Sequence, residues 1–230
     1  MQSLKDRAAV IELSWRCLLK CPLCLRVSHP NMIKEAKESH GDISLEDFEK
    51  AAASYLNCLS LNGNISDPIY HPKFIELLKI VIKYQKLTII HTNGWGRKLS
   101  WWKQVFELSS NQKIKWVFGL DGLPHQSHIY RIGSKGEEVW EVMKYGVSLG
   151  AKIEWQYIPF GYNQNNIDEA IQMAKDHGMG FILRRTTRNF KRLPDDLRKQ
   201  LQPDKKFLYK YGKVLGGTHK TNEKILDIPL

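Results

Sequence analysis

Three cysteines with short, regular spacing are the residues of this chain best suited to chemistry. Cys17, Cys21 and Cys24 form a CxxxCxxC pattern directly after the run Ala8–Leu13, which is apolar except for Glu12. Each thiolate can hold one iron of a cubic [4Fe–4S] cluster, which has four irons. Three ligands on one loop leave the fourth iron open to a substrate or a cofactor. The spacing therefore indicates a reactive cluster more than a purely structural metal site.

A structural zinc ion is the alternative for the same cysteines, but zinc sites of this kind normally have four protein ligands. Cys58 is a weak fourth ligand because it begins an apolar strand pattern, where a cysteine is expected to be a small buried side chain. His29 would give Cys-x3-Cys-x2-Cys-x4-His, which does not match the common zinc spacings.

Composition predicts one globular domain, since the chain has 230 residues, of which 42% are hydrophobic. Four cysteines, with three of them in one short loop, suit metal ligation in a reducing compartment better than a disulfide framework. We see no signal-peptide pattern and no apolar stretch of the roughly 20 residues that a membrane helix needs. We therefore expect a cytoplasmic protein with no membrane partner.

The positive charge is concentrated near the C-terminal end. Of the net +11, the segment from Arg184 to Lys224 contributes thirteen Lys and Arg against four Asp and Glu, or 13 − 4 = +9. Such a segment is either a solvated basic tail or a contact surface for nucleic acid or another anionic partner. We expect residues 1–188 to form the core domain and residues 189–230 a basic C-terminal extension.

Short apolar runs typical of strands alternate with helical patterns along the chain. The predicted strands are Ala8–Leu13, Cys58–Leu61, Leu87–His91, Lys115–Leu120, Lys152–Ile158 and Gly180–Arg184. The predicted helices are Ser44–Asn57, Pro72–Gln85, Leu99–Ser109, Gly136–Leu149 and Ile167–His177, with a broken helix over Pro194–Tyr211 and a glycine-containing tail behind it. This alternation is typical of an α/β fold with a parallel sheet, either open or curled into a partial barrel. Ligands of such sheets bind at the carboxyl ends of the strands.

Polar motifs follow three of the predicted strands. They are Gly63-Asn64-Ile65-Ser66-Asp67-Pro68, Thr92-Asn93-Gly94, and Gly119-Leu120-Asp121-Gly122 with Tyr130-Arg131. Together with the cysteine loop, and in this order, they resemble the radical SAM superfamily over about residues 8–180. The pattern is similar to the core of SPASM/twitch-type peptide-modifying members, with Ser66 in place of a glycine that one subgroup carries. The resemblance implies a partial (β/α)6 barrel with parallel strands and outer helices.

The resemblance also implies an activity. One [4Fe–4S] cluster on Cys17, Cys21 and Cys24 would bind S-adenosylmethionine at its open iron. An electron from a donor such as flavodoxin or ferredoxin would then cleave the cofactor to a 5′-deoxyadenosyl radical. That radical would abstract hydrogen from an unidentified substrate, which is expected to be anionic or a peptide.

Cofactor-binding residues follow from the same resemblance. Gly63, Asn64, Ser66 and Asp67 would surround the methionine ammonium, and Arg131 would pair with the methionine carboxylate. Asn93 or Asp121 would bind the ribose hydroxyls, and Leu23 lies where many relatives have an aromatic beside the adenine. Arg131 as an ordinary surface residue, and Asp121 as a cap of the turn before Gly122, are the alternatives.

Several other residues are candidates for the lining of the substrate site. Gln156 faces either the barrel interior or solvent, and at most one of Arg184 and Arg185 points inward because side chains alternate along a strand. Arg188 would lie close to the entrance. Trp15 and Trp95 are candidates for contact with the substrate or the adenine.

No cysteine follows Cys58, so the auxiliary clusters of many peptide-modifying relatives are not expected in this chain. What remains is a single-cluster enzyme whose product could be oxidised, rearranged, cyclised or cleaved. A second hypothesis is a non-catalytic metal-binding module that binds nucleic acid through its basic end. The motifs at the strand ends have no role in that hypothesis.

Overall fold

A computed structural model describes residues 8–54, 57–184, 186, 188–204 and 226–228. Its sheet has seven strands in sequence order. They are β1 (Ala8–Ile11), β2 (Cys58–Leu61), β3 (Leu87–Thr92), β4 (Ile114–Gly119), β5 (Lys152–Tyr157), β6 (Gly180–Leu183) and β7 (Leu226–Ile228). Neighbours from β1 to β6 are parallel, which confirms the predicted α/β fold, whereas β7 runs antiparallel to β6.

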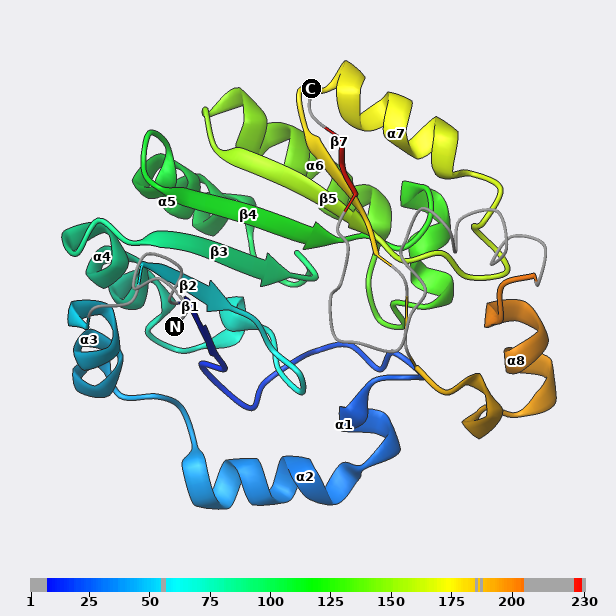
Figure 1. Cartoon of the computed structure of the whole chain (residues 1–230), viewed down its shortest axis with the longest axis horizontal. Coiled ribbons are helices and arrows are strands. Elements are labelled where there is room, and N and C mark those ends of the chain that lie inside the picture. The colour runs from blue at the N-terminus through cyan, green and yellow to red at the C-terminus, as the bar shows by residue number, and fades with distance from the viewer. Residues whose placement is uncertain (1–7, 55–56, 185, 187, 205–225, 229–230) are drawn as a thin grey trace, which may run out of the picture.

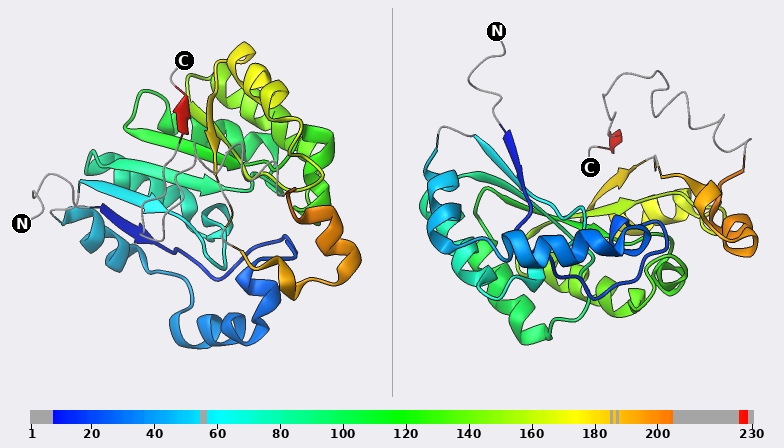
Figure 2. Two further views of the ribbon diagram at one scale, coloured as in Figure 1. Left: turned by 45° about the vertical axis from the view of Figure 1, so that its right-hand side comes forward. Right: turned by 90° about the horizontal axis from the view of Figure 1, so that it is seen from below.

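Helices cover the convex face of this curved sheet, so the parallel strands form a partial barrel (Figures 1 and 2). They are α3 (Leu45–Ala53), α4 (Phe74–Lys83), α5 (Leu99–Ser109), α6 (Gly136–Ser148) and α7 (Ile167–Asp176). These five correspond to the predicted helices, although residues 55 and 56 of the first prediction lie outside the described residues. The concave face is left for a ligand.

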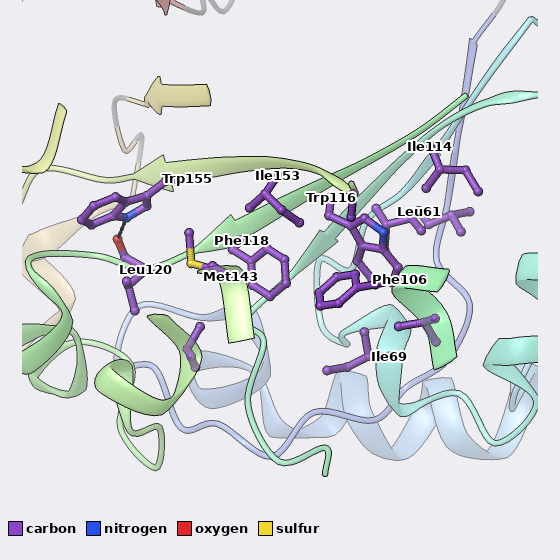
Figure 3. Packing of buried hydrophobic residues seen from close by; sticks show 14 of the residues in the cluster. Leu61, Ile69, Phe106, Ile114, Trp116, Phe118, Leu120, Met143, Ile153 and Trp155 are labelled. Atoms are coloured by element: carbon purple, nitrogen blue, oxygen red, sulfur yellow. Dashed lines mark hydrogen bonds between the residues drawn. The ribbon is translucent and has the colours of Figure 1, made fainter. Parts of the chain in front are cut away.

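The main hydrophobic core lies between the sheet and these helices (Figure 3). Trp116, Phe118 and Trp155 alternate with inward-facing residues along β4 and β5 and are completely buried. Trp155 Nε1 donates a hydrogen bond of 2.6 Å to the carbonyl oxygen of Leu120, so its one polar group is satisfied. Burial of each such ring contributes on the order of 2 kcal/mol to folding, which fixes the strands that carry the site.

The prediction that Pro72 occupies the first helical position is wrong. His71 Nδ1 accepts a hydrogen bond from the backbone N–H of Lys73, and this tight turn delays the start of α4 to Phe74. The segment before α3, for which no element was predicted, contains α1 (Leu25–Ser28), α2 (Pro30–Glu35) and a π-helical turn (Ala36–His40).

The broken helix predicted over Pro194–Tyr211 is present in its first part. Helix α8 spans Asp195–Leu201, and Gln202 is extended because a proline follows it. Residues 205–211 of that prediction lie outside the described residues, as does most of the basic segment. The expected glycine-containing tail ends in strand β7.

Helix α8 packs onto a second, smaller hydrophobic cluster beside the mouth of the barrel. The buried members of this cluster are Leu19, Cys21, Leu23, Tyr130, Ile158, Phe160, Leu193 and Leu201. Residues from both ends of the chain therefore meet at the cysteine loop. Among the residues that the structure describes, no helix has the length and apolar character needed to cross a bilayer.

Candidate active site

A cavity of about 490 Å³ opens at the carboxyl ends of the parallel strands. It is lined by the cysteine loop, the loop after β2 and the ends of β3 to β6. Ten of the residues predicted from the sequence line it: Cys17, Cys21, Cys24, Leu23, Gly63, Asn64, Ser66, Asp67, Asn93 and Arg131. Among the residues predicted to bind the cluster or S-adenosylmethionine, Asp121 is the one that does not line it.

The cysteine loop is held by packing on its inner side. Cys21 and Leu23 belong to the second hydrophobic cluster, and the backbone N–H of Lys20 donates to the Ile132 carbonyl at 2.9 Å. Asn93 Nδ2 lies 3.7 Å from Cys17 Sγ, at donor distance. Burial raises the pKa of Cys17 to about 12 and also raises that of Cys21. A metal centre bound here would displace the thiol protons.

The three thiols surround a space and do not meet at a point. In the described part of the chain, no three His, Cys, Asp or Glu side chains converge closely enough to hold a single metal ion. That arrangement does not favour a zinc ion, whose ligands all lie about 2 Å from one centre. It fits a cubic [4Fe–4S] cluster, because each of the three thiolates would bind a different iron.

The loop Gly63–Asp67 is shaped by residues that the sequence patterns did not identify. Glu12 Oε1 accepts hydrogen bonds from the backbone N–H groups of Ile65 (2.9 Å) and Ser66 (3.0 Å). Arg26 Nη1, on α1, donates to the Ile65 carbonyl at 2.9 Å. Gly63 is required by close approach, since a Cβ there would lie 2.0 Å from the Ser66 carbonyl oxygen. The available signal for Glu12 was its position as the one charged residue in an apolar run.

Asp67 joins this loop to the end of β3. Its buried carboxylate accepts hydrogen bonds from Thr92 Oγ1 (2.9 Å), from the Asn93 N–H (2.6 Å) and from the Ile69 N–H (3.2 Å). Burial raises the pKa of Asp67 to about 6 despite these donors. The carboxylate therefore positions two cavity loops relative to each other.

Arg131 presents its guanidinium to the cavity. Its Nε donates to Asp121 Oδ2 at 2.7 Å, and a Cβ on Gly119 would lie only 2.5 Å from Nη2. The side chain is 18% exposed, which rules out an ordinary surface arginine. Glycine at the end of β4 thus makes room for the guanidinium.

Asp121 has a different position from the one expected. It is completely buried, and Oδ1 accepts from the Ile158 N–H at 2.9 Å while Oδ2 binds Arg131. Its carboxylate is thus used within the protein, so the structure does not support contact with the ribose or the capping of its own turn. Asn93 remains as the candidate for the ribose.

A further set of polar side chains lines the cavity from β3, β5 and the end of β6. Gln156 and Arg184 both face it, and His91, which was not predicted, lies with them. Arg188 also lines the cavity, and its Nη1 donates to the Tyr130 hydroxyl at 2.6 Å. Arg185 lies outside the described residues. The signal for His91 was its place near the end of β3, two residues before Asn93.

The two tryptophans of the mouth loops do not line this cavity. Trp95 is folded back by a 2.9 Å hydrogen bond from its N–H to Asn93 Oδ1. The ring of Trp15 is covered by the guanidinium of Arg16 and the ammonium of Lys37. The expected contact with substrate or adenine is therefore not supported.

Comparisons with known proteins agree with this fold. No protein-family model matches the chain. AlbA of Bacillus subtilis (strain 168), the antilisterial bacteriocin subtilosin biosynthesis protein, is 29% identical over 179 residues, which are 74% of this chain and 37% of AlbA. SuiB of Streptococcus suis bound to S-adenosylmethionine matches 91% of this chain and 47% of its own, with a TM-score of 0.67 and 17% identity. This likeness of fold agrees with the resemblance to the radical SAM superfamily that the sequence motifs carry.

Two further structures are similar in fold to this chain. SuiB bound to its precursor peptide SuiA has a TM-score of 0.64, with 19% identity over 78% of this chain and 39% of SuiB. The protein anSMEcpe, with bound AdoMet and the Cp18Cys peptide, has a TM-score of 0.63 and 16% identity over 91% of this chain and 60% of its own. These likenesses show the fold, a partial (β/α)6 barrel.

The chain spans 37% of the length of AlbA and 47% of SuiB. The expectation of a single cluster therefore applies to these 230 residues.

Proposed function

We propose that this chain is the catalytic core of a radical SAM enzyme that modifies a peptide. The observation that carries the proposal is the cavity, because three cysteines from one loop and the polar strand-end motifs line the same space. When bound, the cluster and S-adenosylmethionine would supply a 5′-deoxyadenosyl radical that abstracts hydrogen from the substrate. The protein would bind and orient the cofactor and the substrate, and it would exclude water.

The roles of the residues follow from their positions in the cavity. Cys17, Cys21 and Cys24 would hold the cluster. Arg131 has only its Nε bound to a carboxylate among the described residues, so its two terminal nitrogens would receive the methionine carboxylate. Asn93 would bind the ribose.

The remaining cofactor contacts would come from the loop after β2 and from the cysteine loop. Asn64 and Ser66 lie on a loop that Glu12 holds in shape, and they would surround the methionine ammonium. Leu23, which is 8% exposed and borders the second hydrophobic cluster, would pack beside the adenine.

A peptide substrate is supported by the relatives, since AlbA acts in bacteriocin biosynthesis and both SuiB and anSMEcpe have been seen with peptides. An electron donor of the flavodoxin or ferredoxin type would approach the outer side of the cysteine loop. Leu18 is 58% exposed there and Lys20 is also exposed.

Anaerobic reconstitution tests the proposal. The full chain should bind about four iron atoms, and with S-adenosylmethionine and dithionite it should release 5′-deoxyadenosine. Cys17→Ala, Cys21→Ala and Cys24→Ala should each abolish release, whereas the matched control Cys58→Ala should retain it. A fully loaded chain that releases none would refute the proposal.

A further inference from the structure

One wall of the cavity carries polar side chains that the cofactor roles above leave unused. His91 on β3, Gln156 on β5 and Arg184 just after β6 all line the cavity. Paired residues on neighbouring strands point to the same face, and so do residues two positions apart on one strand. His91 is linked through Val117 to Glu154, which lies two positions before Gln156. Gln156 pairs with Ile182, two positions before Arg184, so the three side chains share the concave face of the sheet. His91 and Gln156 are therefore held by strands, which position side chains more firmly than loops do.

Gln156 gives the wall a hydrogen-bond acceptor without a donor. Its Oε1 is buried and has no hydrogen-bond partner among the described groups. The neighbouring residue on β4 is Gly119, which has no side chain that could donate a hydrogen bond. Buried polar atoms in folded proteins are nearly always satisfied, so an unmet acceptor that faces a cavity indicates a ligand N–H.

The same wall is positively charged. Burial and the nearby charge of Arg184 lower the pKa of His91 to about 4, so the imidazole is neutral and Arg184 provides the cation. Arg188 adds a second positive charge at the entrance, where it binds the neutral Tyr130 hydroxyl. The carboxylate of Asp67, which also lines the cavity, accepts hydrogen bonds from Thr92 and Asn93.

We propose that this wall binds an acidic peptide segment. Arg184 would bind a side-chain or terminal carboxylate, and Gln156 Oε1 would accept a backbone N–H of the same segment. Neutral His91 would contribute one further donor or acceptor. A peptide fits better than a nucleic acid, because a phosphodiester backbone carries charge but offers no N–H beside it. The inference rests on the proposed function and specifies the substrate class of its site.

Two pools of fluorescein-labelled octapeptides test the wall. The pools share randomised Ala, Gly and Ser positions and differ only in a central Glu or Gln. Anisotropy is measured with the full chain, loaded anaerobically with cluster and S-adenosylmethionine. We expect the Glu pool to bind at least about tenfold more tightly, a typical effect of one charge-assisted contact. Arg184→Gln should remove this preference, whereas the matched surface control Arg192→Gln should keep it.

A second variant tests the acceptor. Gln156→Met has nearly the same volume but no carbonyl oxygen, so it should weaken binding of both pools severalfold. The free protein should melt about 2 °C higher, because an unsatisfied buried acceptor is removed. Gln104→Met, at an exposed position on α5, should change neither quantity.

The results separate this inference from the proposed function. Deoxyadenosine release by the wild-type chain without peptide tests the proposed function alone. The preference for Glu, and its loss in Arg184→Gln, tests the wall and could hold even if no release occurred. Equal binding of the two pools would overturn the inference. An equal loss of the preference for Glu in Arg184→Gln and Arg192→Gln would also overturn it. So would a single-stranded RNA octamer that binds more tightly than the peptides and loses this binding in Arg184→Gln.

Discussion

At the scale of single residues, the site depends on Gly119, which has no side chain to block Arg131. The guanidinium of Arg131 passes over Gly119 so closely that a Cβ would lie 2.5 Å from Nη2, while Asp121 fixes Nε from behind. A fixed planar donor is well suited to recognise a carboxylate. Arg131 thus has its orientation set before any ligand arrives.

Gly119→Ala should therefore weaken cofactor binding without unfolding the chain. Displacement of the guanidinium would remove a charge-assisted contact worth about 1.5–3 kcal/mol, or roughly a tenfold to hundredfold rise in the Kd for S-adenosylmethionine. Anaerobic calorimetry of the cluster-loaded protein measures this constant. Gly180→Ala is the control, since its Cβ would meet only the flexible Glu154 side chain. An unchanged Kd in Gly119→Ala would contradict the role of this contact.

His91 gives a prediction about pH. Its folded-state pKa is lowered from 6.5 to about 4, chiefly by burial and also by Arg184. As pH falls below 6.5 the unfolded chain takes up the proton first, so the stabilisation present above pH 6.5 is lost on the way to pH 4. This loss amounts to about 2 kcal/mol between pH 7 and pH 5.

The measurement compares urea unfolding of the metal-free wild type and His91→Gln at both pH values. The wild type should lose about 2 kcal/mol more than the variant between pH 7 and pH 5. The difference isolates His91, because every other titrating group is common to the two proteins. Equal losses would mean that His91 is not held neutral by the fold.

At the scale of elements, the site is assembled by links between loops that follow different strands. Thr92 Oγ1 on β3 donates to both oxygens of Asp67 in the loop after β2, at 2.9 and 3.2 Å. It also accepts a hydrogen bond from the Gly94 N–H at 3.0 Å. One hydroxyl therefore couples the two loops that would surround the cofactor.

Thr92→Val should destabilise the chain by about 1–3 kcal/mol, because it leaves a buried carboxylate short of a donor. It should also raise the pKa of Asp67 further, since the Thr92 hydrogen bond lowers that pKa. Thr88→Val, on the same face of the same strand, removes only one neutral hydrogen bond to the Lys86 carbonyl. Its cost should be about 1 kcal/mol. If the two variants lose equal stability in urea, the link to Asp67 adds nothing.

Much of this element structure was predictable from patterns that are local in the sequence. Strand β2 and helix α5 have the predicted bounds, because apolar periodicity reports directly on a face that packs against the core. Ten predicted residues line the cavity because the ends of parallel strands meet at one edge.

The failures involve contacts between distant residues. Asp121 was assigned to a ligand because its pairing with Arg131 and Ile158 depends on the third dimension. Glu12 was overlooked because its partners at Ile65 and Ser66 are backbone groups more than 50 positions away. Helix α2 lacks buried residues, so its sequence has no apolar stripe from which a helix could be predicted.

At the scale of the whole molecule, the second hydrophobic cluster joins the two ends of the described chain. Leu201 on α8 is completely buried in the cluster that contains Cys21 and Leu23. The backbone of α8 is also anchored, since the Gly161 N–H donates to the Leu201 carbonyl at 3.1 Å. The cysteine loop therefore depends on packing from nearly 200 residues further along the chain.

Leu201→Ala should lower the free energy of unfolding by about 2–5 kcal/mol, the usual cost of truncating a buried leucine. The cluster-loaded protein should also lose iron faster in the presence of a chelator, which is measured by absorbance at the cluster band. Leu99→Ala, at a position that is 55% exposed, should change neither property appreciably. A destabilised Leu201→Ala with normal iron retention would show that α8 does not support the loop.

Binding of S-adenosylmethionine should stabilise the whole loaded chain. At a free concentration 100 times the Kd, mass action contributes about 2.7 kcal/mol, which for a domain of this size raises the Tm by about 5–10 °C. Differential scanning fluorimetry under anaerobic conditions measures the shift. Cys24→Ala, which removes one cluster ligand, should show little of it.

The position of Leu201 in that cluster also has a consequence for the timing of biosynthesis. After Cys21 has been added to the growing chain, 201 − 21 = 180 positions follow up to Leu201, which belongs to the same cluster. At about 5–20 residues per second, the cysteine loop would lack the packing of Leu201 for roughly 10–40 seconds. During that interval the nascent loop is open to oxidants and adventitious ions, so insertion of the cluster after the end of translation would give the cell the higher yield of intact protein.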